Sequence, residues 1–251
     1  MAWSTAITKI EPNKITVRGK VLSELIGTTR FGQMVYLLLI GKMPEEKVGQ
    51  LIEAILVSSV DHGVTPPSCV AARTVASCGT PLTSALAAGI LSIGNFHGGA
   101  VEDCMRSLLR GLELQKGGMS AAQAAEALVK EAKEAKKRLS GLGHRLHTDD
   151  PRTRRLIEYA RELGLAGKGV EQAEALVAAI GKSSSKTLPL NVDGAIAALL
   201  VDLGFEPEAG NAFFIMSRVP GLVAHILEER RREKPMRTIV PAEAAYDGPE
   251  S

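Results

Sequence analysis

The spacing of hydrophobic residues predicts a chain that is mainly α-helical. Residues 8–18 alternate between apolar and polar side chains around a Pro-Asn pair, which predicts a short β-hairpin or an extended arm. From Leu22 onward the apolar spacing is that of helices. Residues 31–40 are almost entirely apolar and are followed by Gly41, a pattern typical of a buried helix that ends at a glycine.

Further apolar segments predict more helices, separated by short breaks at glycine or proline. An amphipathic helix is expected after Pro44, and Ser120 has the spacing of a capping box at the start of another. Asp150 and Pro151 are suited to begin a helix over 152–163. The other helices are expected over 70–76, 82–91, 101–112, 171–180, 194–203 and 211–230. The sequence does not alternate strands with helices, so it predicts an all-α fold without a parallel sheet.

The chain has 251 residues, which is enough for one domain or for two unequal ones. The break at 117–118 and the polar region up to Asn191 suggest that a smaller domain is inserted into a larger one. We therefore expect a large helical domain formed by residues 1–104 and 194–251, and a small domain formed by residues 105–193.

Composition narrows the class of protein. The chain is 45% hydrophobic and 23% charged, as in an ordinary globular protein, and its net charge of +2 suits an anionic substrate. That charge gives no case for a nucleic-acid or membrane partner. The three cysteines have apolar helical neighbours and are expected to be reduced core thiols: Cys69, Cys78 and Cys104. The sequence predicts a cytoplasmic protein, because neither a secretory signal nor a run of about 20 apolar residues is recognisable.

Three of the five histidines lie in short glycine-containing turns, where they would suit catalysis: His62, His97 and His144. His62 also suits a helix C-terminus, with Gly63 in a left-handed turn. The glycines after His97 let the backbone approach a ligand, and the helix that follows favours negative charge at its N-terminus. An incidental histidine in a flexible turn is the alternative at His97.

Two arginines and one aspartate complete the candidate polar residues. Arg152 begins a predicted helix, where a cation is unfavourable unless a bound anion or a neighbouring acid such as Asp150 offsets it. Arg218 has apolar neighbours, so it needs a carboxylate from the protein or from a substrate. Asp193 could be simply the N-cap of the helix that begins near Gly194. His225, on the same predicted helix face as Arg218, could be a core or surface histidine.

Several common catalytic motifs are missing from the sequence. The cysteines and histidines do not have zinc-finger spacing. The chain has no Gly-x-x-x-x-Gly-Lys-Ser/Thr loop and no Gly-x-Ser-x-Gly elbow. The sequence therefore gives no support for a structural zinc site, a P-loop nucleotide site or an α/β-hydrolase nucleophile.

Five short motifs, in the same order along the chain, resemble those of the citrate synthase superfamily: residues 61–63, 97–100, 143–152, 191–193 and 217–218. The resemblance extends over nearly the whole chain and implies the helical citrate-synthase-like fold. The chain is much shorter than a typical citrate synthase, and Gly194 follows the aspartate of the fourth motif. In both respects it is more similar to stand-alone citryl-CoA lyases and to the C-terminal module of ATP-citrate lyase.

This resemblance implies cleavage of citryl-CoA to acetyl-CoA and oxaloacetate. Asp193 would act as the acid or base, His97 would stabilise the enol of acetyl-CoA, and His144 would face the oxaloacetate carbonyl or the citryl hydroxyl. The residues implied to hold the substrate carboxylates are His62, Arg145, Arg152 and Arg218. The residues implied to contact CoA are Lys186, Gly141 and Gly143.

The resemblance leaves two alternatives open. One is a compact citrate or methylcitrate synthase, and the other is a non-catalytic subunit that binds CoA or a dicarboxylate. The family commonly donates an arginine across a dimer to the partner's active site, but Val240 occupies that position here and Arg237 is the nearest replacement. The resemblance implies a homodimer. It also implies no permanently bound cofactor, because the CoA thioester is the substrate.

Overall fold

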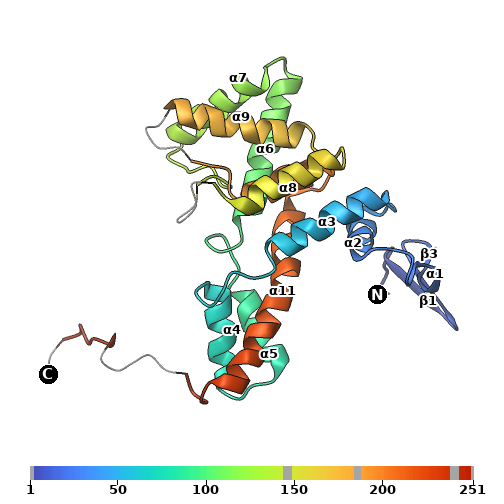
Figure 1. Cartoon of the computed structure of the whole chain (residues 1–251), viewed down its shortest axis with the longest axis vertical. Coiled ribbons are helices and arrows are strands. Elements are labelled where there is room, and N and C mark those ends of the chain that lie inside the picture. The colour runs from blue at the N-terminus through green and yellow to red at the C-terminus, as the bar shows by residue number, and fades with distance from the viewer. Residues whose placement is uncertain (1–2, 144–148, 184–187, 238–242, 250–251) are drawn as a thin grey trace. The chain divides into compact units, whose positions relative to one another are not determined.

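A computed structural model describes residues 3–143, 149–183, 188–237 and 243–249, and it confirms the predicted all-α class (Figure 1). The helices are α1 (Leu22–Leu25), α2 (Phe31–Ile40), α3 (Glu46–Ser58), α4 (Pro67–Ser77), α5 (Leu82–Leu91), α6 (Ala100–Lys116), α7 (Ala121–Glu134), α8 (Pro151–Glu162), α9 (Lys168–Ser183), α10 (Val192–Asp202) and α11 (Pro207–Arg232). The strands are β1 (Thr8–Glu11), β2 (Lys14–Val17) and β3 (Lys20–Val21).

The predicted N-terminal hairpin is confirmed, and a third short strand extends it into an antiparallel sheet. Thr8 lies opposite Val17 in β1 and β2, and Thr16 lies opposite Val21 in β2 and β3. The guanidinium of Arg18 donates a hydrogen bond of 2.8 Å to a backbone carbonyl of α2. This bond attaches the sheet to the first long helix.

The chain forms two compact units. The first unit comprises residues 1–59 and 98–217, and the second comprises residues 60–97 and 218–251. This division differs from the domain boundaries expected from the sequence, which stay a prediction. The polypeptide passes from one unit to the other within α11, between residues 217 and 218.

The core of the first unit is built around α10. Its residues from Gly194 to Leu200 are all buried, and α6, α8 and α9 pack against it. A helix covered on every side is apolar around its whole circumference, as this sequence is. Phe205 closes one end of the core through edge-to-face contacts with Tyr36 and Phe213, at ring-centroid distances of 5.4 and 4.9 Å.

Two predicted helix starts in this unit are confirmed in atomic detail. The Ser120 side chain accepts a hydrogen bond from the backbone of Gln123, and the Gln123 side chain accepts one from the backbone of Ser120. Asp150 accepts a hydrogen bond of 3.0 Å from the backbone N–H of Arg152. These side chains satisfy amide groups that helix formation leaves without intrahelical partners.

Two expectations about burial are wrong. Helix α2 does end at Gly41 with a left-handed φ of 85°, but Phe31 is 67% exposed and Leu39 is 46% exposed. The apolar run is wider than the surface that α3 covers. Cys78 is exposed, whereas Cys69 and Cys104 are buried as predicted, and all three thiols are free.

The second unit is smaller and has a core of small side chains. Helix α4 packs against α5 (Figure 1). Leu222 and Ile226 of α11 join residues of these two helices in an apolar cluster. Gly89 allows this packing, because a Cβ there would lie 3.0 Å from the carbonyl oxygen of Ser68.

Helix α11 has the length and apolar composition of a helix that could cross a membrane. Core helices of soluble proteins can have the same properties, and 44% of the most apolar stretch of α11 is buried inside the protein.

Candidate active site

In the first unit, the segment that precedes His144 pairs with the segment that precedes α10. Leu142 and Leu190 form an antiparallel bridge, and the backbone N–H of Gly143 donates a hydrogen bond of 2.7 Å to the carbonyl of Pro189. The Asn191 side chain donates a second bond, of 2.9 Å, to the Gly143 carbonyl. Two motifs about fifty residues apart in the sequence are thus held together by main-chain pairing.

This pairing is so close that it requires glycine. A Cβ on Gly194 would lie 2.3 Å from the carbonyl oxygen of Gly141. Gly141 has a φ of 81°, and a Cβ there would lie 2.6 Å from the sulfur of Cys104. Gly143, with a φ of 80°, also adopts a backbone conformation that L side chains rarely adopt. Local structure accounts for both turn glycines, and their contact with CoA stays a prediction.

Asp193 lies at this junction, as the second residue of α10. The N-cap is Asn191, whose Oδ1 accepts a hydrogen bond of 3.0 Å from the backbone N–H of Gly194. The alternative that made Asp193 the N-cap is therefore wrong, because the backbone turns from extended to helical two residues earlier, at Asn191. The carboxylate is instead half-buried in the first turn, where the helix dipole favours negative charge.

Cys104 lies close enough to Asp193 for the two groups to interact. Burial, together with the negative charges of Asp193 and Asp103, raises the pKa of the Cys104 thiol to about 12. The thiol therefore stays protonated at neutral pH. It acts as a buried packing group rather than as a nucleophile.

Arg152 has an acidic partner within its own turn. Its Nε and Nη2 atoms donate hydrogen bonds of 3.0 and 2.8 Å to the two oxygens of Asp150, which is 1% exposed. This bidentate ion pair between Arg152 and Asp150 explains how a cation is accommodated at the start of α8. A guanidinium has five N–H donors, so the pair does not exhaust Arg152. The side chain lines a groove of about 560 Å³ between α3 and α8.

In the second unit, His97 is held by a tight turn and by a serine. Its backbone N–H and carbonyl both bond to Gly94, and Gly98 follows with a φ of 91°. The ring Nε2 lies 2.8 Å from the hydroxyl of Ser68, which is fully buried at the start of α4. A hydroxyl both donates and accepts, so this contact orients the ring in either tautomer. The sequence alone did not single out this serine.

Two basic side chains, Arg218 and His62, lie near enough to His97 to affect its pKa. Burial, with the positive charges of Arg218 and His62, lowers the pKa of His97 below its ordinary value of 6.5. His97 is therefore neutral at pH 7, beside groups that attract anions. Arg218 is 5% exposed, as its apolar neighbours predict.

His62 is exposed in the loop after α3, and it is followed by Gly63 with the predicted left-handed φ of 74°. Helix α3 ends at Ser58 with Ser59 as its C-cap, so the sequence-based alternative that placed His62 at the helix terminus is wrong.

The structure thus forms two groups of candidate residues. The first unit holds Asp193, Arg152, Gly141 and Gly143, and the second holds His62, His97 and Arg218. The candidates outside the described residues are His144, Arg145, Lys186 and Val240. Arg237 is described, and its guanidinium bonds to Glu229 of the same chain at 2.7 and 2.9 Å. Within the described ranges, no group of three His, Cys, Asp or Glu residues is arranged to hold a metal ion.

Sequence reasoning did not assign Asn191 a role, although it links Gly143 to the start of α10. Asparagine is among the residues preferred at helix N-caps, so an asparagine directly before the apolar sequence of α10 is a recognisable capping signal. The nearby Asp193 obscured it, because aspartate is an equally good cap by composition.

Comparison with known proteins identifies the family of the chain. A family model described as the citrate synthase C-terminal domain matches residues 44–239. The solved citryl-CoA lyase from Hydrogenobacter thermophilus is 43% identical, with a TM-score of 0.92, over 100% of this chain and 96% of that chain. ATP citrate lyase from Methanosaeta concilii, solved with (3S)-citryl-CoA, is 26% identical with a TM-score of 0.83, over 100% of this chain and 42% of that chain.

Curated sequences give the same result. The probable ATP-citrate synthase subunit 1 of Neurospora crassa is 28% identical over 228 residues, which is 84% of this chain and 32% of that protein. The chain therefore spans about a third of the length of the first curated relatives it matches. The family model covers well over half of the chain, and the resemblance inferred from the motifs is confirmed. This protein belongs to the citrate synthase family.

Proposed function

We propose that this protein is a citryl-CoA lyase, which cleaves (3S)-citryl-CoA to acetyl-CoA and oxaloacetate. The observation that carries the proposal is the similarity to the Hydrogenobacter citryl-CoA lyase, at 43% identity over nearly the full length of both chains. The candidate residues have the chemistry that such a cleavage requires. The reaction must remove a hydroxyl proton, break one carbon–carbon bond and return a proton to the leaving enolate.

In the proposed mechanism, His144 or a water that it holds takes the proton from the citryl hydroxyl. The hydroxyl oxygen becomes the ketone of oxaloacetate as the bond to the acetyl carbon breaks, and the bonding electrons form the enolate of acetyl-CoA. His97 donates a hydrogen bond to the enolate oxygen, and Asp193 in its acid form delivers the proton that completes the methyl group. The lowered pKa of His97 supports this role, since a neutral imidazole can donate without carrying charge.

Substrate binding is proposed to use the cationic residues. Carboxylates of the oxaloacetate part would be held by His62, Arg218, Arg152 and Arg145. The CoA part would contact Lys186, Gly141 and Gly143. A groove of about 620 Å³ includes Ser140, and its lining carries four cationic residues, Arg106, Arg110, Lys137 and Arg138, against the acids Asp103 and Glu131. Arg106 and Arg110 already pair with glutamates, so Lys137 and Arg138 are the groups that favour an anionic ligand.

A homodimer is part of the proposal. Apolar side chains of the first unit are exposed in the single chain, among them Ile10 at 76% and Phe31 at 67%. Large exposed apolar side chains from the β-sheet and α2 are what a subunit interface would cover. Light scattering of the purified protein tests this, and a monomer mass at micromolar concentration would contradict it.

The activity is tested by incubating the purified protein with (3S)-citryl-CoA, malate dehydrogenase and NADH. Released oxaloacetate is reduced to malate, so the proposal predicts NADH oxidation that depends on both protein and substrate. A rate equal to the protein-free control would contradict the lyase.

Two outcomes identify the alternatives. If incubation with acetyl-CoA and oxaloacetate releases free CoA thiol, and citryl-CoA yields no oxaloacetate, the protein is a citrate synthase. Tight binding of CoA or oxaloacetate without either reaction would identify a binding subunit.

A further inference from the structure

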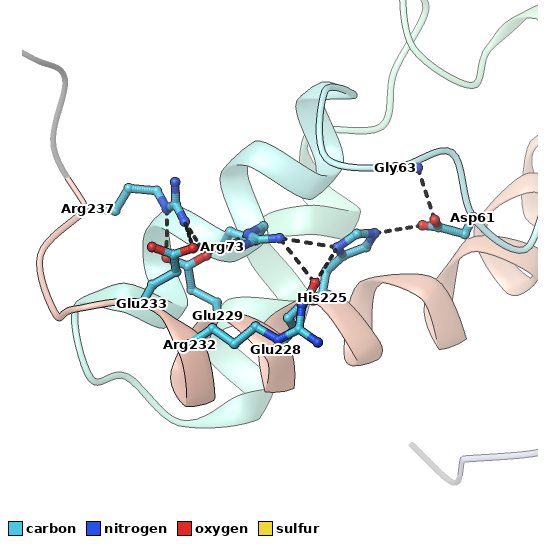
Figure 2. Close-up of polar contacts among 9 residues, drawn as sticks. All are labelled: Asp61, Gly63, Arg73, His225, Glu228, Glu229, Arg232, Glu233 and Arg237. Atoms are coloured by element: carbon cyan, nitrogen blue, oxygen red, sulfur yellow. Dashed lines mark hydrogen bonds and ion pairs between the residues drawn. The ribbon is translucent and has the colours of Figure 1, made fainter.

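His225 connects helix α11 to the loop that carries His62. Its Nε2 lies 3.0 Å from the Oδ1 of Asp61, and its Nδ1 lies 3.4 Å from the Nη1 of Arg73 on α4 (Figure 2). All of these residues belong to the second unit. The His225 side chain is only 13% exposed, so this contact is well packed within the protein.

The partners of His225 determine its tautomer. A guanidinium N–H can only donate a hydrogen bond, so the Nδ1 that faces Arg73 must accept. The ring proton is then on Nε2, where it is donated to the Asp61 carboxylate. Glu228 lies 3.9 Å from Nδ1, beyond hydrogen-bond distance, and does not change this assignment.

Arg73 is itself fixed by a buried acid. Its Nε donates a hydrogen bond of 2.6 Å to Glu229, which is 1% exposed and also accepts from Arg237 (Figure 2). A charge-assisted pair in a buried position holds the guanidinium in one orientation. The line of contacts therefore runs from Glu229 through Arg73 and His225 to Asp61.

Asp61 in turn shapes the loop around His62. Its Oδ2 accepts a hydrogen bond of 3.0 Å from the backbone N–H of Gly63. The Asp61 carboxylate therefore links the residue before His62 to the residue after it. Helix α11 lies directly against this loop, because a Cβ on Gly221 would be 2.4 Å from the Val60 carbonyl and 2.9 Å from Asp61. The loop is held to α11 at two places, four residues apart along the helix.

We infer that the His225–Asp61 pair is a positioning device for His62, which fixes its loop in the orientation that receives a substrate carboxylate. This inference rests on the proposed role of His62 in substrate binding. His225 is a positioning residue rather than a catalytic one, since it acts through Asp61 and the loop backbone.

Substitution at His225 tests the inference through oxaloacetate affinity, measured by calorimetry, and through KM for citryl-CoA. His225→Leu removes the donor to Asp61, and roughly 10-fold weaker binding is expected for the loss of a hydrogen bond to a charged group. His225→Gln keeps an N–H at the position of Nε2 and is expected to restore most of the affinity. Arg232→Gln, a change on the same helix that touches only Glu228 of this group, serves as the unchanged control.

A double-mutant cycle with His62→Ala separates positioning from a general structural effect. If His225 acts through His62, the His225→Leu change weakens binding in the wild type but has no further effect once His62 is alanine. Equal loss of affinity in both backgrounds would overturn the inference. Should His225→Leu fail to fold in a thermal unfolding control, Asp61→Ala takes its place in the same cycle.

The affinity measurement also keeps this inference distinct from the lyase proposal. A wild-type protein that binds oxaloacetate without cleaving citryl-CoA would contradict the lyase, while the cycle would still decide the role of His225. A wild-type protein that cleaves citryl-CoA but shows unchanged affinity in His225→Leu would contradict the positioning role alone.

Discussion

The two units hold their candidate residues by different physical means. In the first unit, Asp193 is positioned by main-chain pairing and by glycines packed against backbone, with Gly194 against Gly141. In the second, the loop of His62 is positioned by charged side chains, from the buried Glu229 to Asp61. The first arrangement should be sensitive to the volume of a side chain, and the second to the removal of charge. Four predictions test this contrast, from the largest expected effect to the smallest.

The largest effect is expected on catalysis in the first unit. Asp193→Asn keeps the shape of the side chain but removes the acid, so kcat for citryl-CoA cleavage should fall by about 10²–10⁴-fold. The midpoint of thermal unfolding should change little. Glu174→Gln, which removes an exposed charge from the same unit, is the control. A wild-type rate in Asp193→Asn would mean that another group moves the proton.

The second prediction breaks the charged arrangement. Glu229→Ala leaves Arg73 and Arg237 without their buried partner and should lower the free energy of unfolding by about 3 kcal/mol. Glu233 pairs with the same two arginines but is 46% exposed, so Glu233→Ala should cost about 0.5 kcal/mol. Chemical denaturation measures both. Equal effects would show that burial of Glu229 does not matter.

The third prediction probes close packing in the first unit. Gly194→Ala places a methyl group 2.3 Å from a carbonyl oxygen, so a loss of about 2 kcal/mol of stability and a lower kcat are expected. A Cβ on Gly181, in α9, would meet no neighbouring atom of the described residues within 4 Å, and Gly181→Ala should stabilise the protein by about 0.5–1 kcal/mol. Opposite signs in these two alanine variants would support the account; a stable, active Gly194→Ala would contradict it.

The smallest effect concerns pH and belongs to the second unit. Burial and the neighbouring charges of Arg218 and His62 lower the pKa of His97, so the unfolded chain binds a proton that the folded protein resists. The stability that this pKa shift contributes is therefore fully present above the ordinary pKa of 6.5, and it declines as the pH falls below that value. Unfolding measured from pH 8 to pH 5 should show a shallower decline in His97→Gln than in the wild type. Identical slopes would assign the pH dependence to other groups.

The helices could be predicted from the sequence because hydrophobic spacing reports which face of a helix is covered. Spacing does not report how much surface a neighbour covers, which is why the exposure of Phe31 on α2 was not anticipated. Nor does spacing distinguish between two possible capping residues that lie two positions apart. Asn191 and Asp193 have similar capping chemistry, and only the extended backbone at Asn191 identifies the cap.

The candidate site could be predicted only where residues lie in short motifs. His62, His97 and Asp193 each have informative neighbours in the sequence. Glu229 and Arg73 do not, because they are 156 residues apart and only folding brings them together. Contacts of this kind could not be predicted from the sequence.

A crystal structure of the protein with citrate and CoA tests the central claim most directly. The account predicts that the citrate carboxylates contact His62, Arg152 and Arg218, and that Asp193 and His97 both lie beside the carboxymethyl group of citrate that faces the CoA thiol. Ligands bound elsewhere, or an Asp193 carboxylate remote from His97 with both ligands present, would contradict it.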